Sequence, residues 1–360
     1  MDSDHRVKLS DYVADFVAGL GIRHLFTLPG GGCMHLTDSF GQHPDIENIC
    51  NLHEQVCAVA ADAYSQYSGN LGVCLVTTGP GGTNTLTGVA GSWLDSIPIL
   101  VISGQVKTAD MTGNRKIRQM GFQEINIVKL AEPVTKYAVT VTNPDQIAFQ
   151  LEKAVHLAKT GRPGPAWIDI PLDIQAKMIE VDSLDHFKPE TEVSGLSDNE
   201  LRHVCESLTE ILLNAKRPVI LAGNGVRISG GLNIFKSLIH QLKIPVLTTW
   251  KAIDFLEDDH PYYCGRPGAI GQRGANFVQQ NADMLIVLGA RLDFGQTGYN
   301  HMNFAPNAKI CMVDIDPAEI DKMECSIELP VQADCHRFLS MFDQNIRTSG
   351  FDEKINERQA

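Results

Sequence analysis

The sequence predicts an α/β protein made of two doubly wound domains, each built on a mostly parallel sheet. Short apolar segments that suit buried strands alternate with amphipathic segments that suit helices along the chain. Glycine-rich turns follow several of the apolar segments, as expected where a strand leads into a helix. With 360 residues, the chain exceeds the size at which one hydrophobic core usually keeps growing, so two domains are expected.

The first domain begins with a helix, a strand and a turn. Apolar residues recur at helical spacing over 8–20, Gly21 ends the helix, and an apolar strand over 22–28 runs into a glycine turn. The pattern then recurs in helix 53–67, strand 72–77, turn 79–82, helix 83–93, and strands 98–104 and 166–170.

The second domain repeats this alternation after a polar segment. Residues 179–198 lack sustained periodicity and are interpreted as a linker between domains 1–178 and 199–345. The expected elements are helix 198–215 and strands 218–223, 245–248, 284–289 and 309–315. The charged tail, 346–360, is interpreted as a hinge leading towards a further domain that this sequence lacks.

Composition excludes several classes of function. A net charge of -13 argues against a nucleic-acid surface, because phosphate binding needs clustered Lys and Arg. The nine cysteines show no paired spacing of a zinc or redox motif, and no apolar run is long enough to span a membrane. We therefore expect a cytoplasmic protein with reduced thiols and predict no metal ligands in this chain.

Three segments of the first domain carry the functional signal. They are Leu-Pro-Gly-Gly-Gly at 28–32, Asn-Leu-His-Glu-Gln at 51–55, and Thr-Thr-Gly-Pro-Gly-Gly-Thr-Asn at 77–84. One glycine turn is weak evidence, since such turns are common between strands and helices, and a lone Glu is usually a solvated helix residue. Two glycine turns that flank a glutamate are a stronger signal.

In order and spacing, these segments resemble the pyrimidine-binding domain of the thiamine-diphosphate carboligases and decarboxylases, in particular the acetolactate synthases. The stretches 103–106, 121–124 and 161–171 support the resemblance, which together with the second domain covers nearly all of the chain. It implies thiamine diphosphate as cofactor. The implied reaction is decarboxylation of a 2-keto acid, with pyruvate the first candidate, and ligation to a second carbonyl compound.

The resemblance assigns Glu54 as the catalytic carboxylate that activates the cofactor. A carboxyl group bonded to a ring nitrogen of the aminopyrimidine favours its imino form, whose exocyclic nitrogen can take the proton from the thiazolium C2. The resemblance also implies a catalytic role for Gln123. Besides Glu54, the implied cofactor-binding residues are Pro29, Gly30, Gly31, Thr78, Pro80, Gly81 and Asn84. Phe122, Met34 and His35 either border the reaction centre or pack within their loops.

Other segments depart from the acetolactate synthase pattern. Leu172 stands where those synthases commonly carry Lys, so their substrate handling does not transfer directly. The segments 249–252 and 265–268 are more similar to synthase homologues associated with cell-surface sugar pathways. In the second domain, a Rossmann-like middle domain by resemblance, 289–293 and 314–317 follow the family pattern. That domain either binds FAD or has lost the flavin site, and Gly223–Gly225 alone is a weak dinucleotide signal.

The family holds the cofactor diphosphate through Mg²⁺ with a Gly-Asp-Gly motif, which this sequence does not contain. The resemblance further implies a homodimer or homotetramer, because the family assembles each site between subunits. Our prediction is an acetolactate synthase-like enzyme that lacks, in this chain, the diphosphate- and Mg-binding domain. The alternative is a non-catalytic truncated homologue acting as a partner or regulatory subunit. A Rossmann-type nucleotide-binding protein is a third hypothesis.

Overall fold

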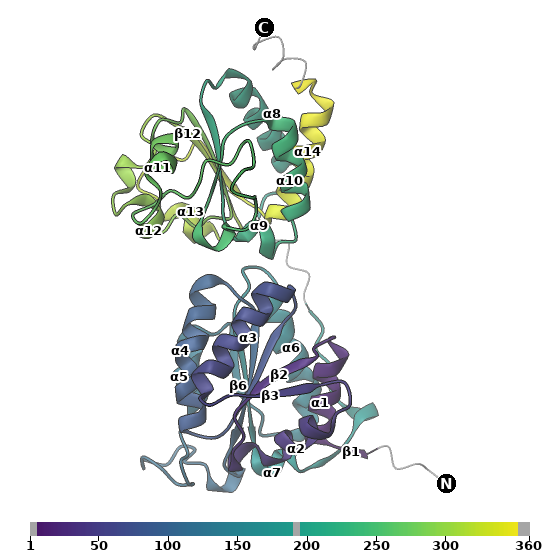
Figure 1. Cartoon of the computed structure of the whole chain (residues 1–360). Coiled ribbons are helices and arrows are strands. Elements are labelled where there is room, and N and C mark those ends of the chain that lie inside the picture. Colours follow the sequence, from purple (N-terminus) through teal and green to yellow (C-terminus); the bar gives the residue numbers. More distant parts are fainter. Residues whose placement is uncertain (1–5, 190–194, 352–360) are drawn as a thin grey trace. The chain divides into compact units, whose positions relative to one another are not determined.

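The computed structural model describes residues 6–189 and 195–351. The chain divides into two compact units, Met1–Thr191 and Glu192–Ala360 (Figure 1). Each unit is an α/β fold around a parallel sheet, which confirms the predicted fold class. Residues 190–194 of the predicted linker and 352–360 of the predicted hinge lie outside the described residues.

The first unit contains a six-stranded parallel sheet in the order β3-β2-β4-β5-β7-β6. Every residue of β4, β5 and β7 is buried, as expected for central strands covered on both faces. The strands are β2 (His24–Thr27), β3 (Glu47–Cys50), β4 (Gly72–Val76), β5 (Ile99–Gln105), β6 (Tyr137–Thr140) and β7 (Ala166–Pro171).

Helices cover both faces of this sheet (Figure 1). One face shares a hydrophobic core with α1 (Leu9–Gly19), α2 (Met34–Gln42), α6 (Ile147–Lys159) and α7 (Leu172–Gln175). Helices α3 (Glu54–Ser68) and α4 (Pro80–Asp95) pack against each other and against the sheet, and α4 contacts the short helix α5 (Ile127–Ala131). A small antiparallel pair joins β1 (Arg6–Lys8) to β8 (Met178–Glu180), so residues expected at the end of the first domain and in the linker form a strand.

The second unit contains a five-stranded parallel sheet in the order β10-β9-β11-β12-β13. Its side chains alternate between two cores: Ile286 and Leu288 of β11 face one, and Leu285 and Val287 face the other. The strands are β9 (Pro218–Ala222), β10 (Val246–Thr248), β11 (Met284–Leu288), β12 (Lys309–Asp314) and β13 (Leu329–Gln332).

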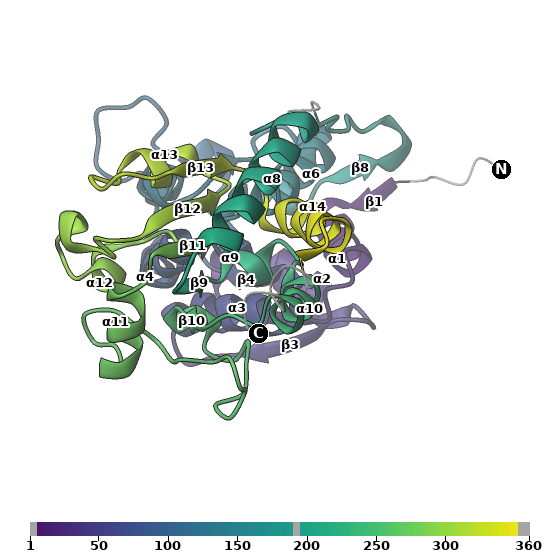
Figure 2. The same ribbon diagram turned by 90° about the horizontal axis from the view of Figure 1, so that it is seen from above.

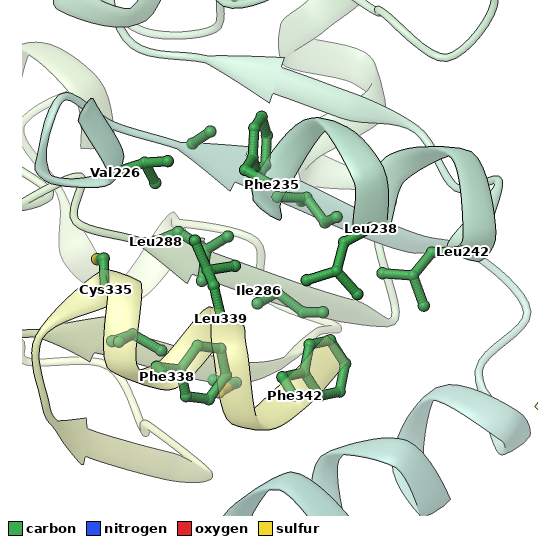
Figure 3. Close-up of a cluster of buried hydrophobic side chains, with 14 of the residues drawn as sticks. Val226, Phe235, Leu238, Leu242, Ile286, Leu288, Cys335, Phe338, Leu339 and Phe342 are labelled. Atoms are coloured by element: carbon green, nitrogen blue, oxygen red, sulfur yellow. The ribbon is translucent and has the colours of Figure 1, made fainter. Parts of the chain in front are cut away.

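The larger core of this unit lies under α8 (Asp198–Asn214), α10 (Leu232–Leu242) and α14 (Cys335–Thr348), which lie together in Figure 2. Phe338 and Phe342 of α14 stack at 5.7 Å and point, with Leu339, towards Ile286 and Leu288 (Figure 3). The remaining helices are α9 (Gly225–Ile228), α11 (Arg273–Gln280), α12 (Phe294–Thr297) and α13 (Pro317–Asp321).

The first helix of this unit begins where predicted, whereas its last helix extends into the predicted hinge. Ser197 and Glu200 form a reciprocal capping box, so a regular helix begins at the end of the predicted linker. Helix α14 continues to Thr348, because Ile346 and Phe351 are buried in the core, so the predicted hinge begins inside a helix. In the described parts of the chain, no helix has the length and apolar character needed to cross a membrane.

Candidate cofactor site

The candidate site lies at the carboxyl edge of the first sheet. Because β2, β3, β4 and β5 are parallel, the loops that follow them leave from the same edge, where open α/β sheets bind ligands. The three signal segments of the sequence follow β2, β3 and β4 in turn. The fold therefore brings together segments whose residues are up to 56 positions apart in the chain, from 28 to 84.

Glu54 is the first residue of α3, and its side chain is 8% exposed. His53 caps the helix, with Nδ1 accepting a hydrogen bond from the Gln55 N–H at 3.1 Å. Asn84 of α4 donates from Nδ2 to Glu54 Oε2 at 3.0 Å. Among the described residues, Asn84 is the only group that donates to this carboxylate, so Oε1 keeps its hydrogen-bonding capacity for another molecule.

The turn after β2 packs directly on the loop after β4 and on the end of β5. A Cβ atom on Gly30 would lie 2.5 Å from the Thr77 Cβ, and one on Gly32 would lie 1.8 Å from Thr78 Oγ1. Gly32 also donates its N–H to Thr77 Oγ1 at 3.1 Å. Contact between loops therefore accounts for glycine at both positions without invoking a ligand.

The remaining predicted cofactor-binding residues fall into two groups. Pro29 and Pro80 are exposed, and a Cβ on Gly31 would meet nothing within 4 Å, so these positions border open space. Thr78 and Gly81 are buried, and a Cβ on Gly81 would lie 3.7 Å from Glu54 Oε1. Pro80 begins α4 three residues earlier than predicted, at the position where proline suits a helix start.

Gln123 reaches the site through its backbone. Gly79 has φ +62°, and a Cβ there would lie 2.0 Å from the carbonyl oxygen of Gln123. Gln123 itself has φ +59°, and its side chain is exposed. Phe122 is 85% exposed and Met34 is 50% exposed, so neither side chain is used in core packing.

A buried carboxylate anchors the segment that carries Gln123. Glu124 accepts hydrogen bonds from the N–H groups of Thr112, Met120 and Gly121 and from the Thr112 hydroxyl at 2.6 Å. Burial alone would raise the pKa of Glu124, but these hydrogen bonds together lower it. The carboxylate therefore ties residues 112–121 to the end of their own loop.

Sequence reasoning did not identify the polar cluster beneath this edge. Asp169 of β7 is 1% exposed and accepts hydrogen bonds from Ser103 at 2.6 Å, Thr140 at 3.1 Å and Gln105 at 3.3 Å. Trp167 Nε1 donates to the same Ser103 oxygen at 2.8 Å. Ser103, Gln105 and Asp169 lie in stretches noted for family resemblance, but their mutual contact arises only from the pairing of β5 with β7.

Burial raises the pKa of Asp169 to about 6 from its ordinary 3.8, against hydrogen bonds that lower it. A raised pKa means that the folded state favours the protonated acid. Asp169 therefore stabilises the fold below its ordinary pKa, and this stability is lost as pH rises through about 6. We expect the unfolding free energy of the wild type, relative to Asp169→Asn, to fall by about 3 kcal/mol between about pH 3 and pH 7 in urea titrations.

Asp173→Asn is the control, because the pKa of Asp173 is shifted in the opposite direction and its effect on stability should depend on pH in the opposite way. Burial tends to raise the pKa of Asp173, but hydrogen bonds, those from Thr108 foremost, lower it overall. The ionised carboxylate therefore stabilises the fold above its ordinary pKa, and acidification removes that stability. A pH-independent difference between wild type and Asp169→Asn would contradict the proposed titration of Asp169.

Comparisons with known proteins agree with this architecture. Residues 7–130 match the family described as thiamine pyrophosphate enzyme, N-terminal TPP binding domain, and residues 205–342 match thiamine pyrophosphate enzyme, central domain. The probable acetolactate synthase large subunit of Methanocaldococcus jannaschii is 36% identical over 321 residues, covering 89% of this chain and 53% of that protein. The acetolactate synthase large subunit of Lactococcus lactis is 35% identical over 336 residues, with coverages of 92% and 56%.

A third relative is the acetolactate synthase isozyme 1 large subunit of Escherichia coli, 34% identical over 325 residues, which are 90% of this chain and 55% of that protein. The chain thus spans about half the length of the curated relatives that it matches. Each matched range falls within one of the two α/β units of the structure. The chain belongs to the thiamine pyrophosphate enzymes, of which it contains the N-terminal and central domains.

Proposed function

We propose that this chain supplies the pyrimidine-binding half of an acetolactate synthase-like active site. The proposed reaction is decarboxylation of a 2-keto acid, with pyruvate the first candidate, followed by ligation of the remaining two-carbon unit to a second carbonyl compound. The observation that carries the proposal is Glu54, a buried carboxylate at the ligand-binding edge whose Oε1 receives no hydrogen bond from the described residues.

The residues around Glu54 fit an aromatic ring with polar nitrogens. Asn84 holds Oε2, which fixes the orientation of the carboxylate, and Gly81 lies beside Oε1, where a Cβ would be 3.7 Å from that oxygen and 2.8 Å from Thr77 Cγ2. Pro29, Gly31 and Pro80 border open space at the same edge. We propose that these residues, with Thr78 and Gly30, hold the aminopyrimidine of thiamine diphosphate.

Bound thiamine diphosphate supplies the electron sink on which decarboxylation and ligation depend. In the proposed mechanism, Glu54 would bind the aminopyrimidine and would serve it as an acid–base group, and Asn84 keeps the carboxylate in place. The Gln123 carbonyl is packed against Gly79, which holds the backbone of Gln123 beside the loop after β4. We propose that Gln123 contacts the substrate there.

Within residues 6–189 and 195–351, no group of His, Cys, Asp and Glu side chains is arranged to hold a metal ion. We propose that the cofactor diphosphate and its Mg²⁺ bind to a domain outside this chain. Leu52, Val56 and Val59, close to Glu54 in the sequence, are exposed apolar side chains, which supports a homodimer or homotetramer because burial of apolar side chains favours association. Sedimentation velocity tests the assembly, and a strictly monomeric protein would contradict it.

The second unit carries the proposal of FAD. The bare backbone of Gly223 and Gly225 packs against Gly289, so these glycines do not themselves indicate a dinucleotide. However, Asn224 Oδ1, just after β9, and both ring nitrogens of His301, in the short 3-10 helix beyond α12, are buried without a hydrogen-bond partner among the described residues. Buried polar atoms without partners fit a missing polar ligand. An absorption spectrum of the purified protein tests for flavin, and a colourless protein would contradict the proposal that the second unit binds FAD.

A cytoplasmic location is also proposed. Its support is that all nine cysteines are free thiols. Cell fractionation tests it.

The test of the proposed function uses the product of the complete gene. We expect consumption of pyruvate that depends on thiamine diphosphate and Mg²⁺, with a ligated product when a second carbonyl compound is present. Release of the simple aldehyde alone would identify a decarboxylase without ligation. A protein that turns over no 2-keto acid but binds a full-length homologous subunit would instead support the non-catalytic partner.

A further inference from the structure

A cluster of positive charge interrupts an otherwise acidic chain beside the candidate site. We define the cationic loop as residues 107–121, between β5 and Gln123. It contains Lys107, Arg115, Lys116 and Arg118 against one carboxylate, Asp110, whereas the whole chain has a net charge of -13. Three of these cations occupy four consecutive positions, so a strong local positive potential is expected there.

The cations of this loop are available to a ligand. All four side chains are exposed. Arg115 donates to the carbonyl oxygen of Met111 at 2.8 Å, which orients its guanidinium without neutralising it. Lys116 and Arg118 form no ion pair with any residue in the described ranges.

The loop is held at both ends while its cationic centre is exposed. Near its start, Thr108 donates its N–H and hydroxyl to the Asp173 carboxylate at 2.8 and 2.6 Å. Near its end, Glu124 binds Thr112, Met120 and Gly121. The carboxylates of Asp173 and Glu124 therefore bind the two ends of the loop and not its cations. An anchored loop presents its charges at lower entropic cost than a free one.

Contacts connect this loop to the catalytic carboxylate. Gly81 borders Glu54 Oε1, Gly79 is packed on the Gln123 carbonyl, and Gln123 follows the cationic loop directly. Arg118 is five residues from Gln123, so their Cα atoms are separated by at most about 18 Å. The positive charges thus lie within reach of a substrate whose anionic group is some distance from its reacting carbonyl.

We propose that the cationic loop binds the phosphate or diphosphate group of the carbonyl acceptor. This inference rests on the proposed function, because it assigns the chemical class of one substrate of that reaction. Arginine pairs with phosphate through two parallel hydrogen bonds, and several cations in sequence suit a group with two or more negative charges better than a single carboxylate. Exposed Ile117, Met120 and Phe122 lie among the cations and suit the organic part of such an acceptor.

The test compares two triple variants of the full chain. Arg115→Gln/Lys116→Gln/Arg118→Gln removes three charges from the loop, and Lys159→Gln/Lys177→Gln/Lys188→Gln removes three exposed charges elsewhere in the same unit. Binding of inorganic pyrophosphate, uridine diphosphate, glucose 1-phosphate and acetate is measured by calorimetry at low salt. We expect the loop variant to bind the phosphorylated probes about tenfold or more weakly, the control variant to match wild type, and acetate to bind none of them.

The probes separate the sources of the anion. Preference for uridine diphosphate over glucose 1-phosphate indicates a diphosphate-linked acceptor, and the reverse indicates a phosphate monoester. Equal binding by wild type and loop variant, or no binding of any phosphorylated probe to wild type, overturns the inference. It is also overturned if the loop variant loses affinity for thiamine diphosphate to the same extent, because the loop would then bind the cofactor. Binding of the probes is measured without turnover, so it tests the cationic loop separately from the proposed catalytic role of Glu54. A Glu54 variant that loses activity but binds the probes like wild type would support both proposals.

Discussion

Glu54→Gln is expected to reduce turnover of 2-keto acid in the product of the complete gene by at least about a hundredfold. The amide cannot share a proton with a ring nitrogen as a carboxylate does, so the contribution of Glu54 as an acid–base group is lost. The shape of the side chain is retained, and its amide oxygen can still accept the hydrogen bond from Asn84. Thermal unfolding of the variant is therefore expected to remain close to that of wild type.

A second measurement tests the Glu54→Gln substitution through binding, with no turnover required. The isolated aminopyrimidine half of thiamine is titrated into this chain, and binding is followed by NMR. We expect Glu54→Gln to weaken binding by about tenfold, the loss of one charge-assisted hydrogen bond. Glu180→Gln, which changes an exposed carboxylate of the same unit, is the matched control. Wild-type turnover in Glu54→Gln would show that Glu54 does not activate the cofactor.

Gly104→Ala is expected to destabilise the first unit by about 3 kcal/mol or more. A Cβ at this position would lie 2.1 Å from the carbonyl oxygen of Gly32 and 2.3 Å from its carbonyl carbon. Both clashing atoms are backbone, so no side chain can rotate away, and the turn after β2 has to move from β5. The same displacement is expected to weaken binding of the aminopyrimidine, because Gly30 and Gly31 belong to that turn.

Gly91→Ala is the matched control. Gly91 lies inside α4, is exposed, and has nothing within 4 Å of a Cβ position. Alanine favours a helix interior over glycine by about 1 kcal/mol, so this variant is expected to be slightly more stable than wild type. The free energies of unfolding of both variants and of wild type are measured by urea titration. Equal stability for Gly104→Ala and wild type would show that the turn after β2 and the end of β5 are not in rigid contact.

Most of the sheet was predictable because its central strands are buried on both faces and therefore read as continuous apolar runs. Strands β4, β5, β7 and β11 follow the predicted segments within one or two residues. Strands β3 and β6 lie at the edges of their sheet, are only partly buried, and contain polar residues that give no such signal. Pairing with a neighbouring strand, a tertiary contact, is what makes them strands.

In the candidate site, too, local features were predictable from the sequence and contacts between distant segments were not. The sequence identified Glu54, Asn84 and the two glycine turns, since their residue types and spacing are local properties of the chain. It did not reveal that Gly30 and Gly32 accommodate Thr77 and Thr78, because those contacts join loops after different strands. Nor did it reveal the Asp169 cluster, in which Ser103 and Gln105 are 66 and 64 residues from Asp169.

The sequence by itself determined two α/β domains, the family to which they belong, and the carboxylate at the start of α3. Periodicity, glycine turns and motif order carry that information because they depend on neighbours along the chain. Only the tertiary structure decided that one oxygen of Glu54 is bound by Asn84 while the other receives no hydrogen bond from the described residues. It also decided that Asp173 anchors the start of the cationic loop, since the pairing of β5 with β7 brings Thr108 and Asp173 together, and that Glu124 anchors the end of the loop.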